Sequence, residues 1–159
     1  MGYGIIHAVG SKREFTSAGV IRVADYLMPD RLKCIYESLA SIIENHCPTV
    51  MAVEQVFMAK NPSAAIKLGQ ARGVAIAAGA VAGLKVHEYS ARQIKQAVVG
   101  IGAADKHQVQ HMVKILLRLS ATPQEDAADA LAAALCHANT EQSMVQLSGS
   151  RRYRRLRVS

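Results

Sequence analysis

Residues 49–56 form the most buried-looking strand of this chain, because nearly every side chain between Thr49 and Val56 is apolar. A strand that is apolar on both faces is typical of a sheet covered by helices on each side. Glu54 interrupts this run near its end. A carboxylate bordering a buried strand loses hydration, and a bound metal ion would compensate for that loss. The run therefore predicts an α/β fold and marks Glu54 as a candidate ligand.

The flanking sequence predicts strands and helices in the order β-β-α-β-α-β-α-α. Residues 2–9 and 14–23 read as a hairpin, with turn formers at 10–13. Helices are expected to begin at Pro29 and Pro62, with Asn61 as N-cap of the second, and Gly69 and Gly73 should let another backbone approach it closely. A strand at 85–89 precedes helices at about 91–98, 105–119 and 123–138. This order implies a mixed sheet with helices on both faces.

Asp126 and Asp129 share one face of the last of these helices, because they are three residues apart. Thr122 and Glu125 match a capping box at its start, and the helix N-terminus favours ionised acids. One interpretation is that the two aspartates only stabilise the helix end. The other is that an alanine-rich, slim helix lies close to the sheet and brings both carboxylates to Glu54. Such a group of oxygens suits Mg²⁺ or Mn²⁺ in a two-metal nuclease.

Length and charge predict one domain followed by a basic tail. The chain has 159 residues and a net charge of +7, and the five arginines of its last ten residues account for five of these seven charges. We place the domain at residues 1–140 and a basic, flexible tail at 141–159. Cys34, Cys47 and Cys136 form no paired spacing and are expected to be reduced thiols of a cytoplasmic protein. Neither a leader nor a membrane span is evident.

Four ordered motifs resemble the RuvC family of Holliday junction resolvases. They are Val53-Glu54-Gln55-Val56-Phe57, the segment from Leu68 to Gly73, the segment from Gln96 to Lys106, and the segment from Glu125 to Ala132. The similarity runs from Gly2 to about His137. It implies an RNase H-like fold with a mixed five-stranded sheet flanked by helices, and a homodimer that cuts four-way DNA junctions by paired nicks in recombination and repair.

The resemblance also implies roles for particular residues. Glu54, Asp126 and Asp129 match metal-binding catalytic carboxylates of a family that uses two Mg²⁺ ions per site, for which Mn²⁺ can substitute. Phe57 matches an aromatic placed to stack on an unpaired base near the junction centre. Lys95 and Lys106 match basic residues for junction binding and cleavage, and Arg72 and Lys60 are weaker candidates for contacts to the DNA backbone. A branch-migration helicase complex is the partner that the resemblance suggests.

The sequence departs from the family at its N-terminus. Met1-Gly2-Tyr3-Gly4 matches the segment just after the family's first strand, so most of that central strand and its aspartate, a fourth metal ligand, are missing. We hypothesise that the chain is truncated and that a longer form carries this strand. For the present chain we expect much weaker metal binding and little or no nicking. The alternative function is a junction-binding protein that does not cleave.

Two further interpretations receive less support. His107 and His111 are four residues apart on a helix and could bind zinc, but Gln108 stands where a metalloprotease has its glutamate and no third ligand is evident. We interpret both as surface histidines. The chain could also be another RNase H-like enzyme with a different nucleic-acid substrate, but Phe57 and the segment from Gly100 to Lys106 resemble the junction resolvases specifically.

Overall fold

The N-terminal strands form the predicted hairpin. We describe the fold from a computed structural model, which covers residues 1–24, 26–55 and 61–155, with side chains up to residue 147. Strand β1 (Gly2–Val9) pairs antiparallel with β2 (Lys12–Val20), and a bulge lies between Ile5 and Ile6. The turn is Gly10-Ser11, and the positive φ of 57° at Gly10 suits a residue without Cβ.

A second pair of strands includes the apolar segment that begins at Thr49. Strand β3 (Val50–Gln55) lies parallel to β4 (Lys85–Ser90), and the long helix α2 (Pro62–Val81) comes between them in the chain. The parallel register places Glu54 opposite Tyr89 and Val53 opposite Glu88. Both strands therefore end at the same edge of the sheet, and Glu54 lies at that edge.

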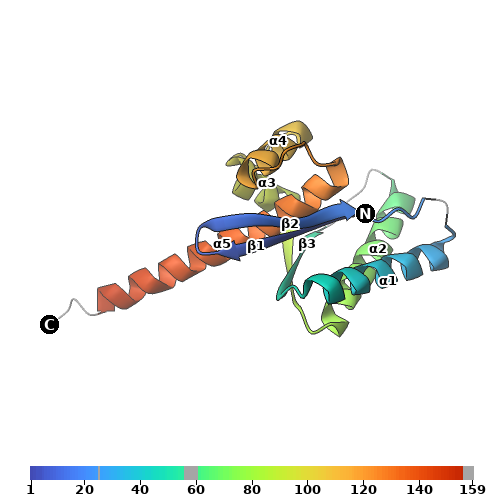
Figure 1. The fold of residues 1–159 in the computed structure, drawn as a ribbon, viewed down its shortest axis with the longest axis horizontal. Helices are drawn as coiled ribbons and strands as arrows, with labels where there is room; N and C mark the ends of the chain where they lie inside the picture. Colours follow the sequence, from blue (N-terminus) through green and yellow to red (C-terminus); the bar gives the residue numbers. More distant parts are fainter. Residues whose placement is uncertain (25, 56–60, 156–159) are drawn as a thin grey trace.

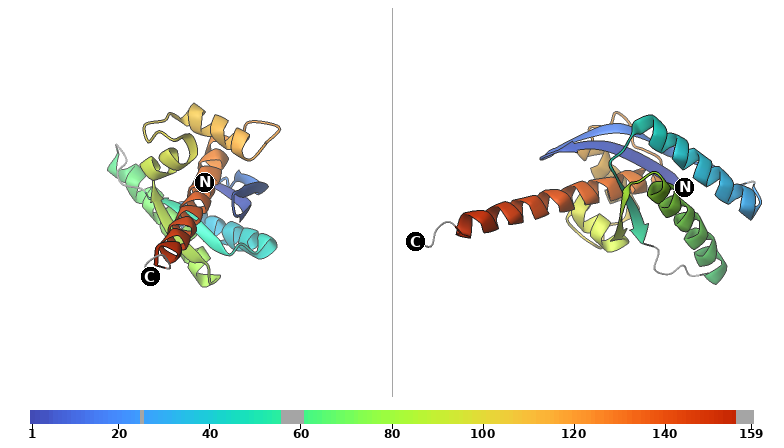
Figure 2. Two further views of the ribbon diagram at one scale, coloured as in Figure 1. Left: turned by 90° about the vertical axis from the view of Figure 1, so that its left-hand side faces the viewer. Right: turned by 90° about the horizontal axis from the view of Figure 1, so that it is seen from below.

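The predicted five-stranded sheet does not form from the described residues. The four strands pair two by two, as one antiparallel and one parallel sheet, and no described strand joins β1 to β3. The interruption falls where the family resemblance places its first strand. This agrees with the expectation that most of that central strand is missing from the chain. Figures 1 and 2 show the hairpin on one side of α5 and the β3–β4 pair on another.

Two helices pack together on one side of the molecule. Helix α1 (Met28–His46) buries Ile35 and Leu39 against Ala75 and Ala78 of α2. The side chain of Asn61 accepts a hydrogen bond of 2.9 Å from the Ser63 amide, as an N-cap should. The close approach expected at Gly69 and Gly73 does not occur within the described part of the chain. Among these residues, nothing lies within 4 Å of a Cβ added at either glycine.

Three helices build the other core. Capping boxes begin α3 (Ala91–Val99), with Ser90 and Gln93, and α4 (Lys106–Leu116), with Asp105 and Gln108. Both helices pack on α5 (Glu125–Arg155), whose Leu131 and Leu135 are almost completely buried. The proposed Thr122 cap was wrong. Helix α5 starts at Glu125, and its first backbone bond runs from the Ala128 amide to the Gln124 carbonyl.

Helix α5 is the axis of the molecule. Its alanine-rich first half lies against β1 so closely that a Cβ on Gly4 would be 2.7 Å from Leu131 Cγ, as expected for a slim helix. The helix then continues to Arg155, through most of the segment assigned to the tail, and projects from the body as a single rod (Figure 1). The limit of the domain at residue 140 therefore does not coincide with a helix end. No helix in the described part of the chain is long and apolar enough to cross a membrane.

Candidate metal centre

Glu54 lies on the face of the β3–β4 sheet that α5 covers. Its register partner Tyr89 points the same way, and the Tyr89 hydroxyl lies 2.8 Å from Nδ1 of His137 on α5. The Glu54 side chain reaches the surface, yet the surrounding protein withdraws water from it, which raises the pKa of its carboxyl group. The negative charge of Asp129 raises this pKa further. Two acids far apart in the sequence are therefore close enough to repel each other.

Asp126 and Asp129 occupy the first two turns of α5, as predicted. Partial burial raises the pKa of Asp129, and the charges of Glu125 and Asp126 add to the increase. Asp126 is also exposed, and one of its carboxylate oxygens lies 3.3 Å from the α-amino group of Met1. The same amino group donates a hydrogen bond of 3.2 Å to the Ile21 carbonyl. Asp126 thus already has a cationic neighbour, whereas Asp129 acts electrostatically on Glu54.

Two lysines flank these acids. The charges of Lys95 on α3 and Lys106 at the start of α4 each oppose the rise in the pKa of Glu54 and of Asp129. Lys106 also forms an ion pair with Glu125, and this contact raises the pKa of the lysine. Sequence reasoning assigned Glu125 to a capping box and missed this pairing. The available signal was that Glu125 starts α5 and Lys106 starts α4, so an acid and a base stand at the first residues of two successive helices.

The other predicted DNA-binding residues differ in their surroundings. Arg72 on α2 forms an ion pair with Glu88 of β4, and its Nε donates a hydrogen bond of 3.2 Å to the Glu54 carbonyl oxygen. It therefore contacts the strand that carries the site. Phe57 and Lys60 lie outside the described residues.

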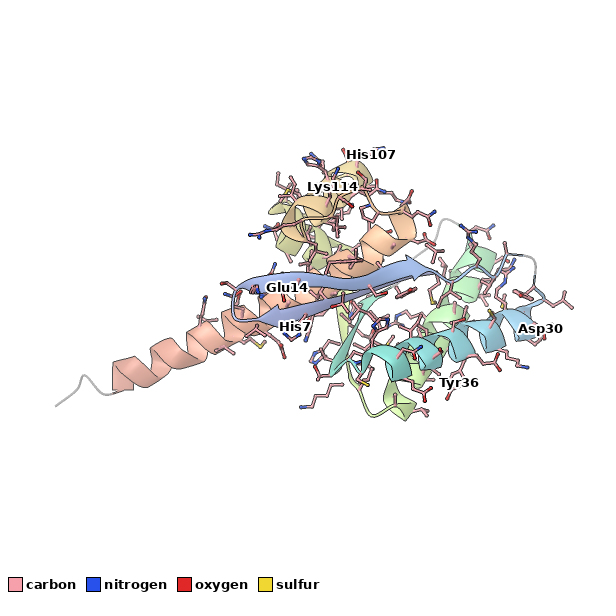
Figure 3. All side chains as sticks on the ribbon, in the orientation of Figure 1. His7, Glu14, Asp30, Tyr36, His107 and Lys114 are labelled. Atoms are coloured by element: carbon pink, nitrogen blue, oxygen red, sulfur yellow. The ribbon has the colours of Figure 1, made fainter. Side chains whose placement is uncertain are left out.

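The donors fit a hard divalent cation in their chemistry. Glu54 and Asp129 offer carboxylate oxygens that repel each other in a partly dehydrated place, and a cation would relieve both effects. Yet the described residues contain no group of three His, Cys, Asp or Glu side chains gathered closely enough to hold one ion. The arrangement is thus an electrostatically coupled pair, with Asp126 one helix turn before Asp129. His107 and His111 belong to no such group either, and Figure 3 shows His107 on α4 at the edge of the molecule.

Comparison with other sequences gives a consistent result. Residues 1–137 match the family described as crossover junction endodeoxyribonuclease RuvC. A protein of that name from Saccharophagus degradans is 57% identical over 99% of this chain and 91% of its own length. The corresponding protein from Teredinibacter turnerae is 56% identical over 99% of this chain and 92% of its own length. These coverages do not support the hypothesis of a truncated chain.

Solved structures agree with the sequences. The structure of Thermus thermophilus RuvC superimposes with a TM-score of 0.80 at 31% identity, over 89% of each chain. The same protein in complex with a Holliday junction substrate gives a TM-score of 0.83 at 30% identity, over 89% of this chain and 88% of that one. These structures bear out the predicted RNase H-like α/β class, although the described strands form two sheets instead of one.

Proposed function

The chain belongs to the RuvC family of crossover junction endodeoxyribonucleases, and we propose that Glu54, Asp126 and Asp129 form its catalytic metal site. It is a structure-selective endonuclease that resolves four-way Holliday junctions in DNA recombination and repair. Nucleases of this family depend on metal ions. The proposal therefore concerns which residues and which ions perform the cleavage in this chain.

One observation supports the site assignment above the others. Glu54, at the end of β3, and Asp129, on α5, are far apart in the sequence. The fold nevertheless brings them close enough for the charge of Asp129 to raise the pKa of Glu54. Two lysines from two further helices act on the same pair. Acidic ligands flanked by cations suit a site where a phosphate must approach bound metal, since the lysines offset the negative charge that accumulates there.

We propose Mg²⁺ as the ion, with Mn²⁺ as a substitute and two ions per site when a fourth carboxylate is present. Bound ions of this kind activate water and stabilise the leaving oxygen of a phosphodiester. Glu54 and Asp129 would hold the ions between β3 and α5, and Asp126 would complete the oxygen set. With three carboxylates alone, we retain the prediction that this chain binds metal much more weakly and shows little or no nicking.

The remaining contacts are proposals of the same kind. Lys95 and Lys106 would bind junction phosphates and favour the ionised carboxylates, while Phe57 would stack on a base and Lys60 would contact the DNA backbone. A homodimer would place two such sites at opposed strands of the junction. A branch-migration helicase complex stays the proposed partner, and the cytoplasm stays the proposed location because the substrate is DNA.

A labelled synthetic four-way junction tests the assignment. The wild-type chain, Glu54→Gln and Asp129→Asn are incubated with the junction in Mg²⁺ or Mn²⁺ and scored for band shift and for nicks. Glu44→Gln is the matched control, because it removes an exposed carboxylate from α1. We expect at most slow nicking from wild type and control, and a further reduction of more than about 100-fold in both site variants, since even residues that only orient metal ligands contribute 10–100-fold.

The outcomes separate the two functions. Nicks that survive in Glu54→Gln and Asp129→Asn would contradict the site assignment. A junction band shift without nicks from any of the four proteins would favour the non-cleaving junction-binding protein instead.

A further inference from the structure

Arg72 reaches the carboxyl end of β3 from the face opposite the metal site. Side chains alternate along a strand, so Glu88, one residue before Tyr89, points away from α5 and toward α2. Arg72 on α2 pairs with this carboxylate. Its Nε also donates a hydrogen bond of 3.2 Å to the backbone carbonyl of Glu54. One guanidinium therefore bridges α2, β3 and β4 behind the proposed ligand.

Arg72 binds the backbone carbonyl of Glu54 and does not occupy its side-chain carboxylate. Among the described strands β3 pairs only with β4, so the end of β3 has support from one neighbour. Arg72 supplies a second support at the residue whose carboxylate must stay in place. A planar guanidinium with several donors can bind a carboxylate and a carbonyl oxygen at once, which lysine cannot do in the same geometry.

Resting on the proposed function, we propose that Arg72 and Glu88 are positioning residues that fix the end of β3 and thereby aim Glu54 at the metal. The exposed fractions of the two side chains are 27% for Arg72 and 40% for Glu88, so the pair is partly shielded by its neighbours. This role differs from the direct contact to the DNA backbone that the sequence suggested for Arg72. A guanidinium already bound to Glu88 and to the strand has fewer donors left for phosphate.

Amide hydrogen exchange of the metal-free protein tests the mechanical part of this proposal. Arg72→Gln and Glu88→Gln should each speed exchange at residues 53–55 by about fivefold, the effect of losing roughly one net hydrogen bond, while β1 and β2 stay unchanged. Arg72→Lys should resemble Arg72→Gln, because an ammonium group lacks the planar set of donors that lets a guanidinium bind Glu88 and the Glu54 carbonyl together. Lys67→Gln is the matched control, because it removes an exposed cation from the same helix. Unchanged exchange at residues 53–55 in both glutamine variants would overturn the proposal.

The functional part is tested by metal titration. The half-saturating Mn²⁺ concentration, measured from free Mn²⁺ by electron paramagnetic resonance and from nicking, should rise about tenfold in both glutamine variants. The double variant should be no worse than either single one, because both remove the same contact. Junction affinity in EDTA and its salt dependence should match wild type. An unchanged half-saturation in both variants would also overturn the proposal.

A phosphate contact predicts a different pattern. Losing such a contact in Arg72→Gln would weaken junction binding in EDTA and lower the salt slope by about 0.9, whereas Glu88→Gln would free the guanidinium and strengthen binding. That pattern would reject the positioning role. If wild-type protein neither binds Mn²⁺ nor nicks, the proposed function fails, and the exchange rates at residues 53–55 still decide the positioning of β3 by Arg72 and Glu88.

Discussion

Glu54 and Asp129, two carboxylates of the proposed metal site, make each other's ionisation less favourable. Glu54 and Asp129 both have raised pKa values, chiefly through partial burial. A group whose pKa is higher in the folded than in the unfolded state stabilises the fold below its ordinary pKa. That contribution is lost as the pH rises through the raised value. Metal-free protein should therefore become less stable as these two groups ionise.

Neutral substitutions at the metal site should stabilise the protein. In EDTA, at a pH above the raised pKa values, Asp129→Asn should unfold at a higher temperature than wild type, because it removes a partly dehydrated charge that repels Glu54. The difference should shrink as the pH falls below the ordinary aspartate pKa. Thermal unfolding followed by circular dichroism at several pH values measures this. A lower unfolding temperature throughout would show that Asp129 has stabilising contacts that outweigh the repulsion.

Lys106 should set part of the pH dependence of nicking. Its charge lowers the pKa of both carboxylates, so Lys106→Gln leaves them more difficult to ionise. The acidic side of the pH–rate profile should therefore move to higher pH, in addition to any loss of junction binding. Lys114→Gln on the same helix is the control. A profile that falls in height without moving would assign Lys106 to phosphate contact alone.

At the scale of elements, close approach between α5 and β1 is a specific requirement of the packing. A Cβ on Gly4 would lie 2.7–2.8 Å from atoms of Leu131, including its backbone nitrogen. Gly4→Ala should therefore destabilise the fold by about 1–3 kcal/mol, the usual cost of overpacking. Gly69→Ala on α2 should instead stabilise it by about 0.5–1 kcal/mol, since it meets open space in a helix. Urea unfolding of both variants measures these changes.

The same packing shows which elements could be predicted from sequence. The hairpin turn and the Asn61 cap depend on residues within four positions of each other, so local rules predicted them. The capping boxes at Ser90 and Asp105 are equally local. The Arg72–Glu88 and Lys106–Glu125 pairs join residues 16 and 19 positions apart, and no local pattern encodes such pairing. The division into two sheets could not be predicted in this way either, because it depends on which strands far apart in the sequence pair with each other. The continuation of α5 could have been inferred, because no proline interrupts the sequence after Pro123.

At the scale of the whole molecule, α5 carries most of the basic tail away from the body. The helix runs through Arg151, Arg152, Arg154 and Arg155. Removing residues 148–159 should weaken junction binding most at low salt and reduce the slope of log affinity against log salt by roughly 0.9 for each arginine that contacts phosphate. Band shifts at several salt concentrations measure the slope. An unchanged slope would mean that the arginines make no contact with the junction.

The two carboxylates of the proposed site lie on different elements. Glu54 is on β3, whereas Asp129 is on α5, which packs both on the hairpin and on the β3–β4 pair. The distance between these carboxylates is therefore set by how α5 is held against β3. Since thermodynamic coupling is reciprocal, anything that fixes that placement must strengthen ion binding by the same factor by which the ion fixes the placement. Ion affinity in this chain thus measures how firmly α5 is ordered on β3.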